Sequence, residues 1–216
     1  MMNIPLLYWA SEVTGDPRYK QIAYMHAETV IKHFVRKDGS VNHIVVFDPD
    51  TGEVVKKPAG QGYAEGSSWT RGQAWAVYGF AMAYHYTKDE QYLETAKKVA
   101  DYFMSNVKGD YIPIDFAQPE SAKYEDTSAA AICACGVLEI LKYVSEDEKE
   151  FYRKSADRLM EILYKNCDFG PDEQSVLQNC SVMYHGEDGR HISLIYGDYY
   201  MLEALMRLNG GDALFY

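Results

Sequence analysis

The chain has 216 residues, enough for one domain with a substantial buried core. Its formal net charge of −11 argues against nucleic acid as the principal partner, because binding a phosphate backbone requires clustered lysine and arginine. No apolar run reaches the length of a membrane span, and the first residues lack the basic segment and cleavage site of a signal peptide, so we expect a cytoplasmic protein.

Helices of one kind are rich in small residues. They are predicted over 4–13, 71–86, 127–144 and 194–208, and the second and third of them carry Ala or Gly at many positions. Small side chains on nearly all sides of a helix indicate tight packing on several faces. We therefore interpret these four segments as inner helices.

Helices of a second kind follow the first three of these segments. Each begins with an acidic turn, starting at Gly15, Lys88 and Glu146, which complements the helix dipole. Each then carries a stripe at offsets 0, +4, +7 and +11 from a tyrosine, with alanine at the second position, as on one face of an amphipathic helix. The three stripes are Tyr19, Ala23, His26 and Val30; Tyr92, Ala96, Val99 and Phe103; and Tyr152, Ala156, Leu159 and Leu163.

An inner helix, a short acidic turn, an outer helix and a long loop form the repeat of an α/α toroid. Tyr19 and Tyr92 are 73 residues apart, and Tyr92 and Tyr152 are 60 apart, so residues 1–216 hold about three and a half hairpins of a single domain. A ring of six hairpins at this spacing needs about 360–400 residues. We therefore predict an all-α, incomplete (α/α)6 toroid whose first hairpins lie upstream of Met1. Apolar surface should be exposed at 1–9 and 194–208 and should promote self-association.

The loop between the first two hairpins contains a predicted β-hairpin near 41–56. Residues 40–47 and 53–56 are typical of two strands, and the intervening 48–52 is typical of a turn. Such an insertion is expected to fold over one mouth of the ring, where loops on a rigid scaffold often carry binding residues.

A Gly-rich polar loop at 61–68 leads into an inner helix that opens with Arg71 and carries Trp75 one turn later. Arginine is a rigid fork of donors that binds a planar carboxylate through two hydrogen bonds, and an indole provides an apolar floor for a sugar ring. The positive end of the helix dipole also favours an anion. The pattern indicates a site for an acidic sugar. A structural alternative has Arg71 bonding a neighbouring loop and Trp75 filling the core.

The four cysteines show neither disulfide nor metal-ligand spacing. Cys133 and Cys135 are two residues apart on a helix and point to different faces, and Cys167 and Cys180 fall in a loop-rich stretch. We expect free thiols, no metal site and no cofactor.

Several residues and runs together resemble the unsaturated glucuronyl hydrolases, glycoside hydrolase family 88. The resemblance covers the whole chain in order, and residues 1–10 resemble an internal segment of that family. It implies an (α/α)6 barrel, in agreement with the repeat. The matching features are His43, Gln61, Trp69-Thr70-Arg71-Gly72-Gln73-Ala74-Trp75, Asp126-Thr127-Ser128-Ala129-Ala130-Ala131 and Ser193-Leu194-Ile195-Tyr196-Gly197-Asp198-Tyr199-Tyr200.

The resemblance implies a glycosidase that releases an unsaturated glucuronic acid from the non-reducing end of oligosaccharides made by polysaccharide lyases. In that family an Asp protonates the C4=C5 double bond and assists the addition of water at C5, unlike the two-carboxylate displacement of most glycosidases. By position, His43, Gln61, Arg71 and Trp75 are expected to contact substrate. Arg71 is expected to hold the uronate carboxylate and Trp75 the sugar ring.

The catalytic Asp of the family lies just upstream of the segment that matches Met1, so no residue of this chain inherits its role by motif. The candidate pocket acids are Glu65, Asp126 and Asp198, although Asp126 and Asp198 are equally suited to a structural place at a helix N-terminus. The chain alone is therefore expected to be inactive.

Two alternatives stay open, a hydrolase of unsaturated rhamnogalacturonyl disaccharides and a catalytically dead sugar-binding module. In the leading interpretation the partner is an unsaturated uronyl oligosaccharide derived from a glycosaminoglycan or a gum.

Overall fold

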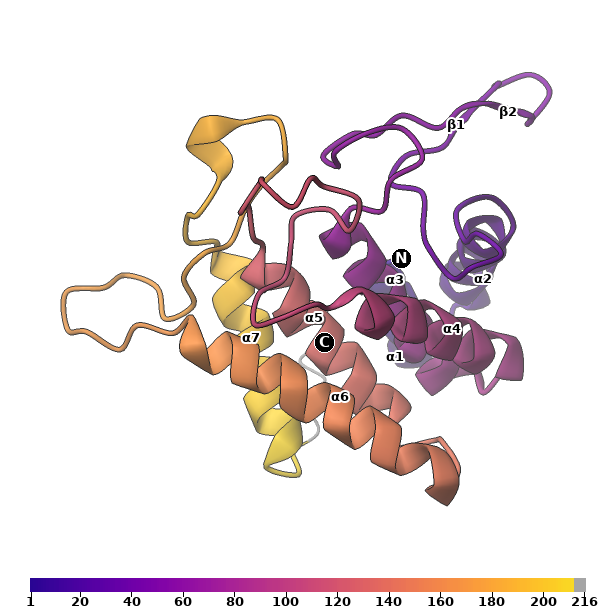
Figure 1. Ribbon diagram of the computed structural model, residues 1–216. Helices are drawn as coiled ribbons and strands as arrows, with labels where there is room; N and C mark the ends of the chain where they lie inside the picture. The colour runs from indigo at the N-terminus through magenta and orange to yellow at the C-terminus, as the bar shows by residue number, and fades with distance from the viewer. Residues whose placement is uncertain (212–216) are drawn as a thin grey trace.

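The computed structural model describes residues 1–211, most of which lie in α-helices (Figure 1). The helices are α1 (Ile4–Thr14), α2 (Pro17–His33), α3 (Thr70–Thr87), α4 (Glu90–Asn106), α5 (Thr127–Ile140), α6 (Glu146–Lys165) and α7 (Ile195–Leu208). The strands β1 (Val46–Phe47) and β2 (Val54–Lys56) pair antiparallel, and a short 3₁₀ helix, η1 (Glu187–Gly189), precedes α7. This order follows the predicted repeat.

The helices form hairpins that stand side by side. α1, α3 and α5 pack against α2, α4 and α6 respectively, α3 contacts both α1 and α5, and α5 contacts α7. The long loops lie at the end where α3, α5 and α7 begin (Figure 1), which we call the loop end. The odd-numbered helices are therefore inner and the even-numbered ones outer, which confirms the predicted incomplete α/α toroid.

The small residues of the inner helices allow their backbones to approach closely. Every residue of α5 is buried, and burial in α3 is continuous from Ala76 to Tyr84. A Cβ on Gly136 of α5 would lie 2.8 Å from the backbone nitrogen of Tyr78 in α3, so this contact requires glycine. The inner helices thus pack on several faces, as their composition predicted.

Two predicted elements are shorter in the structure. The helix expected over 127–144 ends at Ile140, where Tyr143 donates to the Ile140 carbonyl three residues back and tightens the chain into the turn before α6. The strand expected over 40–47 is reduced to β1, because Val41 pairs with Val35, just after α2, and not with the return strand.

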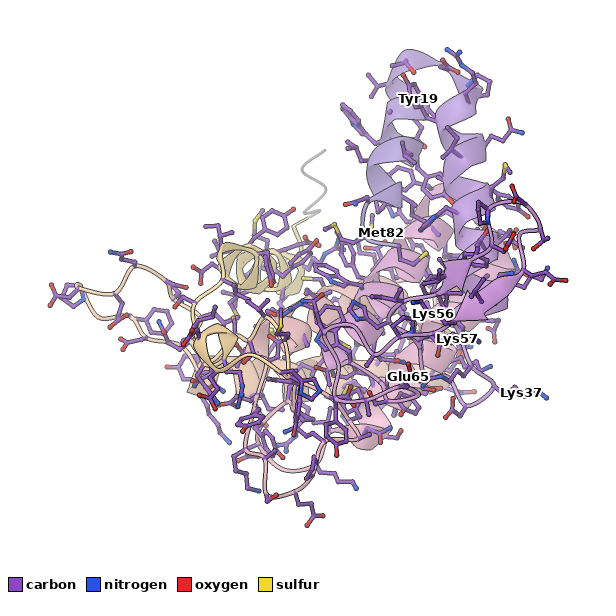
Figure 2. The ribbon with its side chains drawn as sticks, turned by 90° about the horizontal axis from the view of Figure 1, so that it is seen from above. Tyr19, Lys37, Lys56, Lys57, Glu65 and Met82 are labelled. Atoms are coloured by element: carbon purple, nitrogen blue, oxygen red, sulfur yellow. The ribbon has the colours of Figure 1, made fainter. Side chains whose placement is uncertain are left out.

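The tyrosine stripes of the outer helices are fully buried in two of three cases. All four residues are buried in the stripes that begin at Tyr92 and Tyr152. In α2, Ala23 and Val30 are buried, whereas Tyr19 and His26 are exposed. Figure 2 shows Tyr19 near the end of the α1–α2 hairpin, which projects from the other helices. The predicted equivalence of the three stripes therefore holds only in part.

The two buried tyrosines fix the register of neighbouring outer helices. Tyr92 of α4 donates to Glu28 of α2 over 3.1 Å, and Tyr152 of α6 donates to Asp101 of α4 over 3.3 Å. Each acceptor lies nine positions after the tyrosine position of its own stripe. The bond from hydroxyl to carboxylate is therefore part of the repeat.

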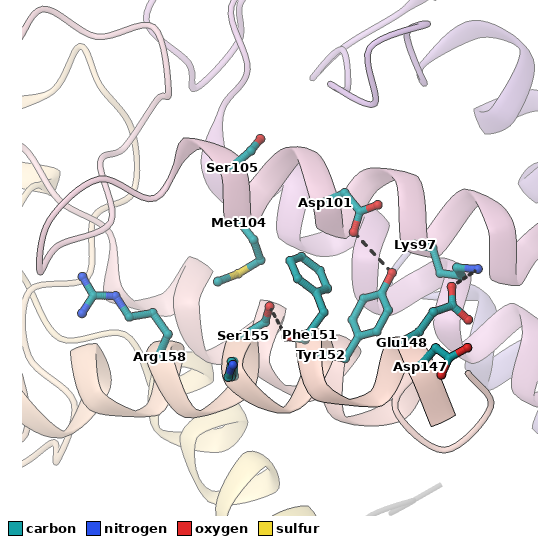
Figure 3. Close-up of a pocket in the computed structure, with 11 residues that line it drawn as sticks. Lys97, Asp101, Met104, Ser105, Asp147, Glu148, Phe151, Tyr152, Ser155 and Arg158 are labelled. Atoms are coloured by element: carbon teal, nitrogen blue, oxygen red, sulfur yellow. Dashed lines mark hydrogen bonds and ion pairs between the residues drawn. The ribbon is translucent and has the colours of Figure 1, made fainter. Parts of the chain in front are cut away.

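A groove of about 750 Å³ separates α4 from α6 on the outer side of the molecule and is spanned by the second of these bonds (Figure 3). Phe151 and Met104 supply apolar walls, and Lys97 forms an ion pair with Glu148 at one end. Because these polar groups pair with one another across the two helices, we interpret the groove as a gap between loosely packed outer helices.

Apolar side chains are exposed at both edges of the arrangement, as predicted. Ile195 and Leu202 of α7 are 84% and 58% exposed, and Leu6 of α1 is 51% exposed. Exposed apolar surface favours association, and self-association stays a prediction. Within residues 1–211, no helix combines the length and the apolarity that a membrane span requires.

Candidate functional site

A cavity of about 370 Å³ opens between α2, the loops that follow it and the start of α3. Its lining includes His43, Gln61, Trp69 and Trp75. Three of the four residues expected to contact substrate therefore share one cavity. The fourth, Arg71, lies behind the wall, with its guanidinium carbon 4.6 Å from the centre of the Trp69 ring.

His43 is held by residues 59–61, where the chain enters the Gly-rich loop. Its Nδ1 lies 3.0 Å from the carbonyl oxygen of Ala59 and 3.0 Å from the backbone nitrogen of Gln61, and its Nε2 has no hydrogen-bond partner within residues 1–211. Burial lowers the pKa of His43, and the Arg71 guanidinium acts in the same direction, which favours a neutral ring. A Cβ on Gly60, whose φ is +60°, would come within 2.2 Å of Nδ1, so this contact requires glycine.

Gln61 connects the cavity to the segment 180–192. Its Nε2 donates to the Val182 carbonyl over 2.7 Å, and its backbone carbonyl accepts from the Tyr184 nitrogen over 2.9 Å. Its Oε1 has no partner in the described part of the chain. A ligand hydroxyl group can therefore donate to this oxygen.

Arg71 has more internal partners than the sequence suggested. Its side chain is only 3% exposed. Nη1 donates to Asp126 Oδ2 over 2.6 Å and also contacts the Ser128 hydroxyl and the Ser181 carbonyl, while Nη2 donates to the Val182 carbonyl over 2.8 Å. The guanidinium also lies between two aromatic rings, those of Trp69 and Tyr196, with the latter centre 5.4 Å away.

Two N–H groups of the Arg71 guanidinium have no partner within residues 1–211. Both N–H groups of Nη1 and one of Nη2 are engaged, which leaves the Nε–H and the second N–H of Nη2 without partners within residues 1–211. Nε and Nη2 share one side of the planar fork, and a carboxylate can bind such a side through two parallel hydrogen bonds. Carboxylate binding by Arg71 stays a prediction that this geometry allows.

Trp75 combines the two roles considered for it. Its ring packs edge-on against Tyr200 of α7, with centroids 5.3 Å apart. The same ring is half-buried and lines both the cavity of His43 and a neighbouring cavity of about 480 Å³ that includes Leu7 and Ile22. Trp75 therefore contributes to the packing of inner helices and still offers an apolar surface to a ligand.

Asp126 is fully buried at the start of α5 and does not line the cavity. Its Oδ2 accepts from Arg71, and its Oδ1 accepts from the Ser128 hydroxyl over 2.5 Å and from the Ser181 nitrogen over 3.2 Å. Burial raises the pKa of Asp126, and the Arg71 charge opposes that rise.

The other two candidate acids lie away from the cavity. Asp198 accepts from the Ser175 hydroxyl and from the Leu177 nitrogen, both over 2.8 Å, and so holds the loop before α7. It lines a separate cavity beside that loop. Glu65 is exposed on the Gly-rich loop (Figure 2).

No protein-family model matches the chain. Over 98% of its length the chain is 39% identical to the unsaturated glucuronyl hydrolase of Bacillus sp. strain GL1. The crystal structure of the Bacillus sp. GL1 enzyme, described as responsible for the degradation of glycosaminoglycan, matches 95% of this chain with a TM-score of 0.90. The chain is a homologue of the unsaturated glucuronyl hydrolases.

The chain spans a little over half the length of the curated relatives that it matches, 58% of the Bacillus sequence and 56% of the chain in its crystal structure. An unsaturated glucuronyl hydrolase variant from Streptococcus agalactiae, complexed with dGlcA-GalNAc6S, is 36% identical with a TM-score of 0.85. That match covers 95% of this chain and 56% of the Streptococcus chain.

Two residues of this unsaturated glucuronyl hydrolase homologue contribute to the site but were not singled out individually from the sequence. Trp69 is 5% exposed, its ring centre lies 4.3 Å from that of His43, and its Nε1 has no partner within residues 1–211. Asp115 is fully buried and accepts from the Tyr63 nitrogen over 3.0 Å and the Ser67 hydroxyl over 2.7 Å, which fixes the Gly-rich loop. The Trp69 side chain was visible in the motif, whereas nothing local marks Asp115.

Proposed function

We propose that this chain binds an unsaturated uronic acid at the non-reducing end of a lyase-generated oligosaccharide. The resemblance implies that the complete enzymes release this sugar by hydrating its C4=C5 double bond. The observation that carries the proposal is the cavity shared by His43, Gln61 and Trp75, whose wall residue Trp69 packs on the Arg71 guanidinium. Two N–H groups of this guanidinium have no partner within residues 1–211. The described activity of the Bacillus enzyme on glycosaminoglycan and the dGlcA-GalNAc6S complex support this class of ligand.

In this proposal each residue recognises one feature of the sugar. The Nε–Nη2 edge of Arg71 holds the uronate carboxylate, which is planar and accepts two parallel bonds. Trp75 supports the apolar face of the ring. Nε2 of His43 and Oε1 of Gln61, which have no partners within residues 1–211, bind hydroxyl groups. The Gln61 oxygen accepts, and Nε2 donates or accepts according to the tautomer of the ring.

We further propose that the chain alone turns this ligand over negligibly. The reaction needs an acid that protonates C4, and positioned acid–base catalysis is worth about 10²–10⁴-fold. Asp126 is engaged by Arg71, Ser128 and Ser181, and Asp198 holds the loop before α7. Neither is free to deliver a proton to a sugar in the cavity. The same observation supports the second candidate function, a sugar-binding module without catalysis.

The test combines binding with turnover on the 216-residue chain. Calorimetric titration with an unsaturated uronyl disaccharide is expected to show weak binding, and the ultraviolet absorbance of its conjugated double bond is expected to persist. The matched control is the saturated disaccharide, which keeps the carboxylate but has a different ring shape. Absence of binding to both disaccharides would overturn the proposed function. Clear loss of absorbance would overturn the assignment of negligible turnover and point to an acid within the chain.

A further inference from the structure

Asp126 ties together three parts of the molecule at the wall of the cavity. It is the N-cap residue of α5, accepts from Arg71 at the start of α3, and accepts from the backbone of Ser181 in the segment before α7. Its side chain has no exposure to solvent. Asp126 is not part of the cavity lining, and both of its carboxylate oxygens already accept hydrogen bonds.

The guanidinium of Arg71 can turn about several bonds, and its orientation is set by what it contacts. The carbonyls of Ser181 and Val182 are neutral acceptors, and the rings of Trp69 and Tyr196 restrain its plane. Its charged partner is Asp126, at 2.6 Å. Charge-assisted bonds of this kind are stronger and more directional than neutral ones.

We propose that Asp126 is a positioning residue, which fixes the Arg71 guanidinium so that its Nε–Nη2 edge is presented for carboxylate recognition. This inference rests on the proposed binding of a uronate. Because Asp126 neutralises the charge of Arg71, the edge selects a carboxylate through its orientation, and general attraction for anions contributes little. Loss of Asp126 then removes discrimination for the carboxylate specifically, while contacts to the rest of the sugar persist.

The experiment compares Asp126→Asn with the wild-type chain for two probes, an unsaturated uronyl disaccharide and its methyl ester. The ester keeps the ring and the hydroxyl groups and lacks the anionic carboxylate. In the wild type, the acid is expected to bind about 10–100-fold more tightly than the ester, as one bidentate charge-assisted contact provides. In Asp126→Asn this ratio is expected to fall to within about threefold, chiefly through weaker binding of the acid.

Two results would overturn the inference. Equal weakening of acid and ester would indicate a purely structural role, and tighter binding of the acid would indicate that Asp126 competes with the ligand for Arg71. If the wild type binds neither probe, or binds both equally, the proposed function fails first, so the two failures are distinguishable.

Two further variants keep the test informative. If Asp126→Asn does not fold, Ser128→Ala provides the test. This change removes a hydroxyl that donates to Asp126 over 2.5 Å. It should also lower the ratio of acid to ester affinity, by a smaller factor. Asp198→Asn is the matched control, because this aspartate lies in the first turn of the next inner helix and, within residues 1–211, bonds to the loop before it and not to Arg71. It is expected to leave the ratio of acid to ester affinity unchanged.

Discussion

Two buried arginines, one near each end of the inner helices, show how similar ion pairs serve different purposes. Arg71 lies near the start of α3 at the loop end, and Arg207 lies in the last turn of α7 at the opposite end. Both side chains are almost completely inaccessible, 3% and 2% exposed. Arg207 is paired with carboxylates of two inner helices, and Arg71 is paired with that of Asp126, the N-cap residue of α5.

The two arginines differ in what surrounds the guanidinium. Arg207 meets two carboxylates, those of Glu139 and Glu203, and its three nitrogens all make contacts. Arg71 meets one carboxylate and two backbone carbonyls, and its Nε–H and one N–H of Nη2 have no partner within residues 1–211. A buried arginine with all its nitrogens engaged holds helices together, whereas one with a free edge can also bind a ligand.

The largest effect is expected for Arg207→Met. This change leaves Glu139 and Glu203 buried without their shared cation, and breaking a buried pair in this way costs about 3–5 kcal/mol of unfolding free energy. Urea denaturation followed by circular dichroism measures that loss. Lys154→Met is the control, because Lys154 and its partner Glu150 are both more than 70% exposed, and surface pairs of this kind contribute about 0–1 kcal/mol. Equal losses of unfolding free energy in the two variants would show that burial of the Arg207 ion pairs does not increase their contribution to stability.

Arg71→Lys is expected to reduce stability less than Arg207→Met does, and to weaken ligand binding more. The ammonium keeps a positive charge for Asp126, but it lacks the planar fork that binds a carboxylate through two bonds. Affinity for the unsaturated uronyl disaccharide should fall by about 10–100-fold, as measured by calorimetry. Retention of wild-type affinity would show that Arg71, like Arg207, is purely structural.

The contrast between the two arginines also shows how much of the structure could be predicted from the sequence. Periodicity placed the inner and outer helices, because a helix repeats its faces at fixed spacing. The spacing of Arg71 and Trp75 predicted the region of the candidate site for the same reason. The partners of Arg71 in the segment before α7 lie 110 and 111 residues further along, and no local pattern encodes a contact over that separation.

The stripes of the outer helices show a related limit. A stripe of apolar residues specifies which face of a helix can be covered, but it does not specify that a neighbour covers it. Tyr92 and Tyr152 are buried by adjacent helices, whereas Tyr19 has the same place in the repeat and is exposed. Glu139 and Arg207 were not anticipated either, because their side chains meet only when α5 and α7 stand side by side.

Glu139→Gln is expected to reduce stability by an intermediate amount that depends on pH. Burial by itself raises the pKa of Glu139, but the hydrogen bond from His85 and the charges of Arg207 and Lys142 outweigh it and hold the pKa well below its usual range. A carboxylate whose pKa is lowered by folding stabilises the protein above its unfolded pKa, and the contribution is lost as the pH falls. The variant should therefore be less stable by about 1–3 kcal/mol at pH 7. The difference should shrink below about pH 4, the ordinary pKa of glutamic acid.

Urea denaturation of the wild type and Glu139→Gln across the acid range measures this dependence. A difference that stays constant from neutral to acid pH would indicate that the ionised form of Glu139 does not matter and that packing alone accounts for the change. Glu139→Gln removes a charge with little change in side-chain volume, whereas Arg207→Met changes both. Comparing the two losses of unfolding free energy then separates the contribution of charge from that of volume.

The smallest effect is expected on the outer side of the molecule, where buried tyrosine hydroxyl groups donate to carboxylates of the neighbouring outer helix. Tyr152→Phe removes the 3.3 Å bond to Asp101 and leaves the buried ring in place, so the loss should be about 0.5–1.5 kcal/mol of unfolding free energy. Tyr19→Phe makes the same chemical change at the equivalent position of the repeat, where the ring is 38% exposed, and should alter stability by less than about 0.5 kcal/mol. Thermal or urea denaturation of both variants provides the test. If Tyr19→Phe costs as much as Tyr152→Phe, then Tyr19 has an acceptor in solution, and the open face of α2 is covered there.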